Sequence, residues 1–153
     1  MPIENSPGTF ELIYHSMASV EIRDKDIEDI LEVAQRFNGA NNITGCLLFH
    51  NQEFLQILEG EKEVVQGLFE RIKKDKRHTH VSLVSEGETP IRSFTGWSMA
   101  FQSICFNSMA QIKNVLSLEE LENLVGVIDK PTTAKKMFAY LAKGIIDSNK
   151  RFL

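Results

Sequence analysis

The feature that most constrains this chain is the segment from residue 42 to residue 60, NITGCLLFHNQEFLQILEG. Two short apolar runs flank a polar turn at residues 50–52, a pattern that predicts a β-hairpin. One uncharged polar side chain, Gln56, lies in the middle of the second run. A buried amide without partners costs about 1–3 kcal/mol, so Gln56 must form hydrogen bonds. Because a glutamine both donates and accepts, it can bind a ligand carbonyl and a ring nitrogen in two orientations.

Length and composition are those of an ordinary globular protein. The 153 residues favour one domain, spanning 1–153, which is large enough to bury a core without disulfides or metal. The hydrophobic fraction of 42% and the charged fraction of 25% support the same conclusion. The net charge of −4 gives no electrostatic reason to expect nucleic acid or an anionic membrane as a partner.

Cysteine usage and the N-terminal sequence predict a cytoplasmic protein. Cys46 and Cys105 match no metal-binding spacing and are most simply buried free thiols in a reducing compartment. Residues 1–10 have neither the basic start nor the apolar run of a signal peptide. No apolar run approaches the roughly 20 residues that a membrane-spanning helix needs.

The order of periodic segments predicts an α+β fold. Strands are expected at residues 10–16, on each side of the turn at 50–52, at 81–85 and near 97–101. Amphipathic helices are expected at about 24–38 and 62–75, and residues 87–96 are expected to form a loop. This β-α-β-β-α-β-β order is typical of a ferredoxin-like sheet with two helices on one face.

The C-terminal part of the chain is expected to cover the other face of the sheet, since a large open apolar face is unusual on a soluble monomer. Residues 117–120 form a capping-box pattern that begins a helix at 118–127, and a second helix follows Pro131. We therefore expect one domain with a core at residues 10–102 and a helical extension at residues 107–153.

Several polar and aromatic residues occupy positions in the predicted strands, namely Tyr14, Gln56, Trp97 and Met99. Taken singly, a strand tyrosine, tryptophan or methionine is most often part of the core. Asn38 before Gly39 is most often a turn residue, and the charges after residue 70 are most often a solvated helix end. Only their combination, at these intervals, favours a binding site.

The chain closely resembles the BLUF family of flavin-binding blue-light sensors. The resemblance covers residues 10–102 and is carried by Leu12-Ile13-Tyr14-His15-Ser16, Asn38, Ile43-Thr44-Gly45, residues 54–60 and Trp97-Ser98-Met99. The intervals from Tyr14 to Gln56, from Asn38 to Gln56 and from Gln56 to Trp97 also look like those of the family. An extended match of this kind is much more specific than a short motif.

The resemblance implies a noncovalently bound flavin, FAD or FMN, held between the two helices. The residues that it implies for binding are Tyr14, Asn38, Gln56, Arg71, Ile72, Asp75, Arg77 and His78. By this analogy Asn38 binds a carbonyl and the N3 edge of the ring, and Gln56 bridges Tyr14 to N5 and O4. A flat, mostly apolar ring with few heteroatoms suits a slot between apolar helices that carry amide and guanidinium groups.

The resemblance also implies a photocycle without a substrate. Excited flavin takes an electron and a proton from Tyr14, and Gln56 rotates or tautomerises before the pair recombines. The altered hydrogen bond then lowers the transition energy of the flavin and gives a small red shift. Trp97 and Met99 lie on the predicted fifth strand, through which such a switch is expected to reach the C-terminal helices.

The sequence departs from the family pattern at a few positions. Asn42 stands where relatives often have glycine, and asparagine tolerates a left-handed backbone. Phe37 replaces a polar residue that some relatives carry, and Phe49 with His50 forms an unfamiliar strand end. After residue 107 the resemblance is only to short members with two trailing helices.

The main hypothesis is a stand-alone sensor that is not an enzyme. Its output would be changed binding to a downstream signalling protein or changed self-assembly, and we expect a homo-oligomer because small sensors commonly assemble symmetrically. One alternative is a small acylphosphatase-like hydrolase in which Arg71 and Asn38 grip phosphate, but residues 16–20 lack that family's glycine-rich loop and arginine. Another is a flavin- or ligand-binding module that is indifferent to light.

Overall fold

The computed structural model describes residues 9–19, 22–50, 52–94, 100–103 and 132–150. In chain order, the elements are β1 (Thr9–Ala18), α1 (Asp24–Ala40), β2 (Thr44–His50), β3 (Glu53–Gly60), α2 (Lys62–Lys74), β4 (His78–Thr89), β5 (Ala100–Ser103) and α4 (Thr133–Lys150). The strands form one sheet in the order β4-β1-β3-β2-β5, with β5 parallel to β2 and the other neighbouring pairs antiparallel. This arrangement confirms the predicted ferredoxin-like fold.

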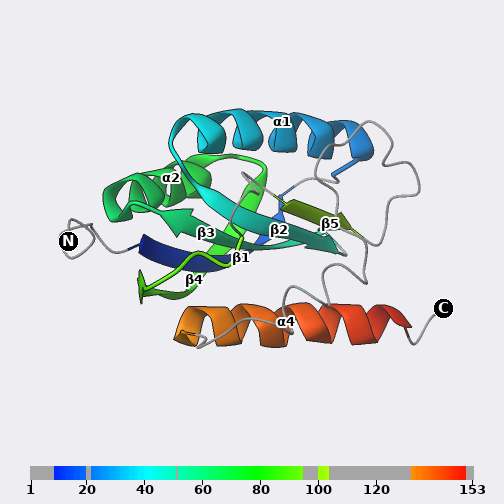
Figure 1. Ribbon diagram of the computed structural model, residues 1–153. Helices are drawn as coiled ribbons and strands as arrows, with labels where there is room; N and C mark the ends of the chain where they lie inside the picture. The colour runs from blue at the N-terminus through cyan, green and yellow to red at the C-terminus, as the bar shows by residue number, and fades with distance from the viewer. Residues whose placement is uncertain (1–8, 20–21, 51, 95–99, 104–131, 151–153) are drawn as a thin grey trace, which may run out of the picture.

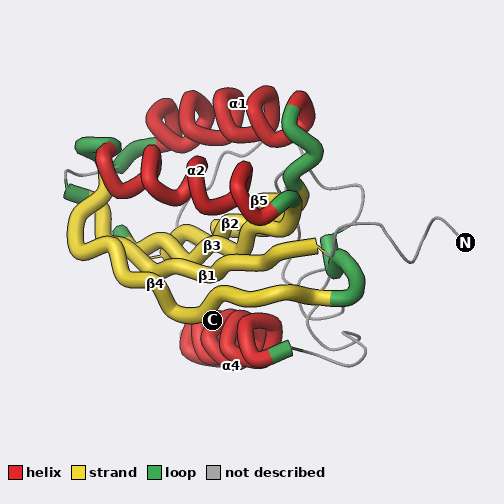
Figure 2. The backbone as a smooth tube through the Cα atoms, turned by 90° about the vertical axis from the view of Figure 1, so that its left-hand side faces the viewer, coloured by secondary structure: helices red, strands yellow, loops and turns green. Residues whose placement is uncertain are grey.

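The sheet is covered on both faces. Helices α1 and α2 lie together on one face, and α4 lies across the other (Figures 1 and 2). The prediction that two helices cover one face is therefore confirmed, as is the packing of a C-terminal helix on the second face. None of the helices in the described ranges combines the length and apolar character that a bilayer crossing requires.

Alternation along the strands separates the core into two parts, because successive side chains of a strand point to opposite faces. In β1, Leu12 and Tyr14 belong to the cluster under α1 and α2, whereas Ile13 belongs to the cluster under α4. In β3, Phe54 and Leu58 face the first pair of helices, and the odd-numbered residues face α4. Gln56 shares the parity of Phe54, which places it on the face under α1 and α2.

The predicted hairpin is present. Residues His50 and Glu53 pair at its end, so two residues connect β2 to β3. Gln52 has φ 63 there, and its side-chain amide exchanges two hydrogen bonds with the backbone of Ile22, which fixes the hairpin to the entry of α1. Asn42 has φ 56, the left-handed conformation that asparagine was expected to tolerate.

The prediction for the fourth strand was wrong in its bounds, and the prediction for the fifth is tested only in part. β4 runs from His78 to Thr89 rather than over 81–85, because it pairs with β1 along its whole length, beyond the apolar residues that predicted it. The expected loop at 87–96 therefore starts later. β5 is described at Ala100–Ser103, while the expected start near 97 lies outside the described residues, as do Trp97, Met99, Cys105 and the helix predicted at 118–127.

Candidate functional site

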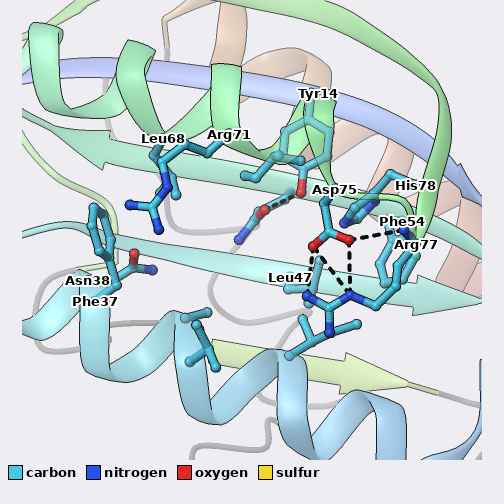
Figure 3. A pocket seen from close by; sticks show the side chains of 15 residues that line it. Tyr14, Phe37, Asn38, Leu47, Phe54, Leu68, Arg71, Asp75, Arg77 and His78 are labelled. Carbon is cyan, nitrogen blue, oxygen red and sulfur yellow. Dashed lines mark hydrogen bonds and ion pairs between the residues drawn. The ribbon is translucent and has the colours of Figure 1, made fainter.

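A cavity of about 250 Å³ lies between the sheet and the two helices that cover its first face (Figure 3). It is lined by residues from β1, β2, β3, α1, α2 and the start of β4. The structure brings to this one cavity all eight residues that the sequence predicted for cofactor binding: Tyr14, Asn38, Gln56, Arg71, Ile72, Asp75, Arg77 and His78.

Tyr14 and Gln56 form the polar floor of the cavity. They are direct partners in the antiparallel register of β1 and β3, and the Tyr14 hydroxyl donates a hydrogen bond to Gln56 Oε1. Both side chains are buried. Burial, and secondly the negative charge of Asp75, raises the pKa of the Tyr14 hydroxyl well above its usual range. Tyr14 is therefore a neutral hydrogen-bond donor whose partner is Gln56.

One face of α1 forms a wall of the cavity. Its lining residues are Ile30, Val33, Ala34, Phe37 and Asn38, which recur at the spacing of one helix face. Asn38 is buried, and its backbone carbonyl accepts hydrogen bonds from the amides of Asn41 and Ile43 at the helix end. α1 continues to Ala40, beyond the predicted stop at residues 38–39. Asn38 is thus a rigidly held helix residue rather than a turn residue.

The opposite wall comes from α2. Leu68 and Ile72 supply apolar surface, one helical turn apart. Arg71 extends from α2 toward Asn38 and Phe37, and its guanidinium carbon lies 4.8 Å from the centre of the Phe37 ring (Figure 3). A cation over an aromatic face is attracted by the ring quadrupole. Phe37, a departure from some relatives, therefore helps to position Arg71 at the cavity.

A charged pair forms one rim of the cavity just after α2. Arg77 Nη2 lies 2.6 Å from Asp75 Oδ2, and the Arg77 backbone amide donates to Asp75 Oδ1 at 2.9 Å (Figure 3). The hydrogen bonds from Arg77 lower the pKa of the Asp75 carboxyl, and the same pairing raises the pKa of Arg77. The two side chains hold a fixed pair of opposite charges that can bind polar ligand groups.

His78 begins β4 and connects the rim to the floor. Its Nδ1 lies 2.8 Å from Ser16 Oγ, and its ring centre lies 4.6 Å from that of Phe54. Its ring also meets the ring of Tyr14 edge-on, with 6.3 Å between centres. Burial lowers the pKa of His78, with Asp75 opposing that change. His78 is therefore a neutral imidazole at neutral pH, wedged against the photoactive candidate Tyr14.

Several lining residues were not predicted from the sequence to belong to the site. These are Ile30, Val33, Ala34, Leu47, Phe54 and Leu68. Val33 is 57% exposed, which places an apolar side chain at the open mouth of the cavity. Ile30, Ala34 and Asn38 share one face of α1 by their helical spacing. That spacing was the sequence signal from which Ile30 and Ala34 could have been placed at the site. Trp97 and Met99, predicted to be photoactive, lie outside the described residues.

The lining fits one part of a flavin. A cavity with apolar walls and a few amide, guanidinium and carboxylate groups suits a heteroaromatic ring whose polar atoms lie along one edge. Its volume is near the lower limit of ligand pockets, about 300 Å³, so it suits a ring system whose attached chain extends past the rim. The fold and the site together define a ferredoxin-like domain with a ligand-sized pocket under its helix pair.

Comparison with known proteins identifies the family. The family model described as BLUF, sensors of blue-light using FAD, matches residues 9–100. The chain therefore belongs to the BLUF family, and the predictions of a blue-light sensor and of a flavin, FAD or FMN, as its cofactor are confirmed at the level of the family, whose description names FAD. The family description names sensors, which agrees with the predicted role of the matched residues.

Two individual proteins are similar in sequence to this chain. The chain is 42% identical over 73 residues to the beta subunit of the photoactivated adenylate cyclase of Euglena gracilis. It is 35% identical over 83 residues to the blue light- and temperature-regulated antirepressor BluF of Escherichia coli. These matches cover 48% and 54% of this chain, but only 8% and 21% of the two relatives.

A solved structure matches over nearly its full length. The photo-activated state of BlsA superposes with a TM-score of 0.62 at 29% identity. The superposition covers 82% of this chain and 99% of that one. The likeness to the cyclase and the antirepressor therefore covers a small part of each, whereas the likeness to BlsA covers most of both chains.

Proposed function

We propose that this chain senses blue light through FAD bound in the cavity, with Tyr14 and Gln56 as its photoactive pair. The observation that carries the proposal is the hydrogen bond from the Tyr14 hydroxyl to Gln56 Oε1, formed by register partners at the cavity floor. The remaining lining residues, among them Asn38 and Arg71, bind and orient the ring.

FAD, when bound, supplies the ring that absorbs blue light and accepts an electron and a proton. Tyr14 is suited to be the donor, because its raised pKa keeps the hydroxyl proton in place until an electron leaves. Gln56 presents its carbonyl oxygen to Tyr14. Rotation of this amide would present its NH₂ group instead, so the side chain has two nearly isosteric states with different hydrogen bonds. Such a bistable group is suited to store a signal.

The test is an absorption spectrum of purified protein in darkness and after blue light. We expect a yellow protein with a small, reversible red shift, and we expect Gln56→Leu and Tyr14→Phe to keep the flavin and lose the shift. Tyr140→Phe is a matched control, because Tyr140 is 76% exposed on α4. A normal photocycle in either pocket variant would rule out the mechanism.

The same measurement separates the two alternatives. Bound flavin with no response to light would favour a light-indifferent module. A protein that takes up no flavin but turns over acyl phosphate would revive the hydrolase. The matches to light-regulated proteins support neither alternative.

We further propose that residues 10–102 form the sensor core and residues 107–153 an output extension. Output would reach a downstream signalling protein or a second copy of the chain, in the cytoplasm, with Trp97 and Met99 taking part in the switch. The relatives support a signalling role, since they include a photoactivated cyclase and an antirepressor. Light-dependent elution in size-exclusion chromatography tests self-assembly.

A further inference from the structure

The two strands that carry the photoactive pair also carry a pair of buried acids. Glu11 on β1 and Glu59 on β3 are direct register partners, three residues from Tyr14 and Gln56 respectively. An odd separation along a strand turns the side chain to the opposite face, so both acids face α4. Neither side chain is more than 1% exposed. Like charges paired across strands repel one another, and buried charges require partners.

Helix α4 supplies the balancing cation. Lys135 is 2% exposed, and its Nζ lies 3.3 Å from Glu11 Oε2 and 3.8 Å from Glu59 Oε2. Nζ also donates hydrogen bonds to Thr89 Oγ1 at 2.8 Å and to the Ile91 carbonyl at 2.6 Å. The ammonium group is therefore held between two strands and the end of β4, at a point fixed by the register.

The contacts of the two acids extend this cluster. Thr132, just before α4, donates its hydroxyl hydrogen to Glu11 Oε1. Glu59 accepts hydrogen bonds from the backbone amides of Ser93 at 2.6 Å and Phe94 at 3.0 Å. Among the described residues Glu11 Oε2 accepts no hydrogen bond, so its ion pair with Lys135 is what balances it there.

We propose that the cluster of Glu11, Lys135 and Glu59, here called the acid–lysine cluster, positions α4 according to the hydrogen-bond state of Tyr14 and Gln56. This proposal rests on the proposed function. A changed bond between Tyr14 and Gln56 alters how β1 and β3 sit against each other. Glu11 and Glu59 lie on the same two strands, three residues away and on the other face. A shift of β1 relative to β3 therefore also changes the spacing of the two carboxylates that bind Lys135.

The physical argument for a positioning role is that buried ion pairs add little net stability. The free energy lost in removing the two charges from water is about as large as the free energy gained from their attraction. The attraction is gained only when the two groups have the right distance and orientation. Such a cluster therefore selects one docked position of α4 rather than simply strengthening its docking. A small displacement of either acid makes that position less favourable, and the apolar contacts of Phe138 and Ala142 can then hold α4 in another.

The critical variant removes the cluster while conserving its charge. Glu11→Gln combined with Lys135→Met leaves a formal charge of −1, the same as two acids and one lysine. Glu59 is kept, so its bonds to the amides of Ser93 and Phe94 remain. Lys136→Met is the control, because Lys136 is the exposed neighbour on α4.

The readout is amide hydrogen exchange of α4 in darkness and under blue light, with the red shift recorded in the same samples. In the native protein and in Lys136→Met, we expect light to change α4 exchange by about fivefold or more. In the double variant, we expect a normal red shift with a light effect on α4 below about twofold. Lys135→Met alone, which leaves two unbalanced acids, should raise α4 exchange in darkness by about tenfold or more.

A double variant with a normal red shift and a native light effect on α4 would overturn the proposal. So would a native protein that shows the red shift without any change in α4. Absence of the red shift in native protein overturns the proposed function instead, so the two failures are distinguishable. Glu11→Gln alone is the milder second variant if the double variant does not fold, and it should also weaken the light effect on α4.

Discussion

The two faces of one sheet treat buried polar groups in different ways. Under α1 and α2, Tyr14 and Gln56 are neutral, share a hydrogen bond and border a cavity. Under α4, Glu11 and Glu59 are buried acidic side chains held by Lys135, next to the edge-on contact of Phe94 with Phe138. Each pair is in register on the same two strands.

This difference separates a group that can rearrange from a group that holds its position. A neutral amide has two orientations of nearly equal shape and lies beside space for a ligand. Removing the cation that pairs with a buried carboxylate lowers the stability of the fold by several kcal/mol. The carboxylate therefore tolerates only one arrangement. The first face is thus suited to detect a change, and the second to convert it into a helix position. Variants that remove one partner on each face test this contrast.

The largest effect is expected from Lys135→Met in the flavin-free protein. It leaves Glu11 and Glu59 buried and unbalanced, so we expect the free energy of unfolding to fall by about 3–5 kcal/mol, measured by urea denaturation. The control is Lys25→Met, which breaks the exposed pair of Lys25 with Asp29 on α1 and should cost no more than about 0.5 kcal/mol. Equal losses in the two variants would contradict the contrast between a buried cluster and a surface pair.

A smaller effect is expected from Tyr14→Phe on the first face. It removes a neutral donor and leaves Gln56 Oε1 beside a cavity, so we expect a loss of about 1 kcal/mol in the same urea experiment. Tyr140→Phe, at an exposed position, should leave the unfolding midpoint unchanged. A loss as large as that of Lys135→Met would show that the floor of the cavity is as rigidly specified as the acid–lysine cluster.

The smallest effect is expected from the titration of His78. Burial lowers the pKa of His78 in the folded protein below its usual value of 6.5, so the unfolded chain binds the proton more readily. The free energy of unfolding should therefore fall as the pH falls from about 6.5 through the folded pKa. Urea midpoints at pH 7.5 and 5.5 measure this, and His78→Gln should reduce the difference. If His78→Gln leaves the difference between the two urea midpoints unchanged, groups other than His78 cause the pH dependence.

Much of the fold was predictable because it follows from local patterns. The two apolar runs on either side of the polar turn at residues 50–52 predicted a hairpin, and the apolar spacing of 24–38 and 62–75 predicted the helices that became α1 and α2. The eight cofactor residues were predicted from the resemblance to BLUF proteins, and the structure lines one cavity with all of them. Their contact with flavin stays a prediction.

The bounds of β4 were not predictable from its residues. His78 and Thr79 look like a solvated segment in sequence, yet they pair with Ala18 and Met17 at the end of β1. Backbone pairing with a neighbouring strand extends a strand irrespective of the apolar pattern of its side chains. This extension is what places His78 against Ser16 and Tyr14.

The sequence by itself determined the order of strands and helices, the parity that buries Tyr14 and Gln56 on one face, and the family. These features depend on neighbours within a few residues or on recurring motifs. Only the tertiary structure placed Glu11, Glu59 and Lys135 together. Lys135 is 124 residues from Glu11 along the chain, from 135 − 11, and no local period connects them. The charges meet because the register aligns the two acids and α4 docks on the face opposite the cavity.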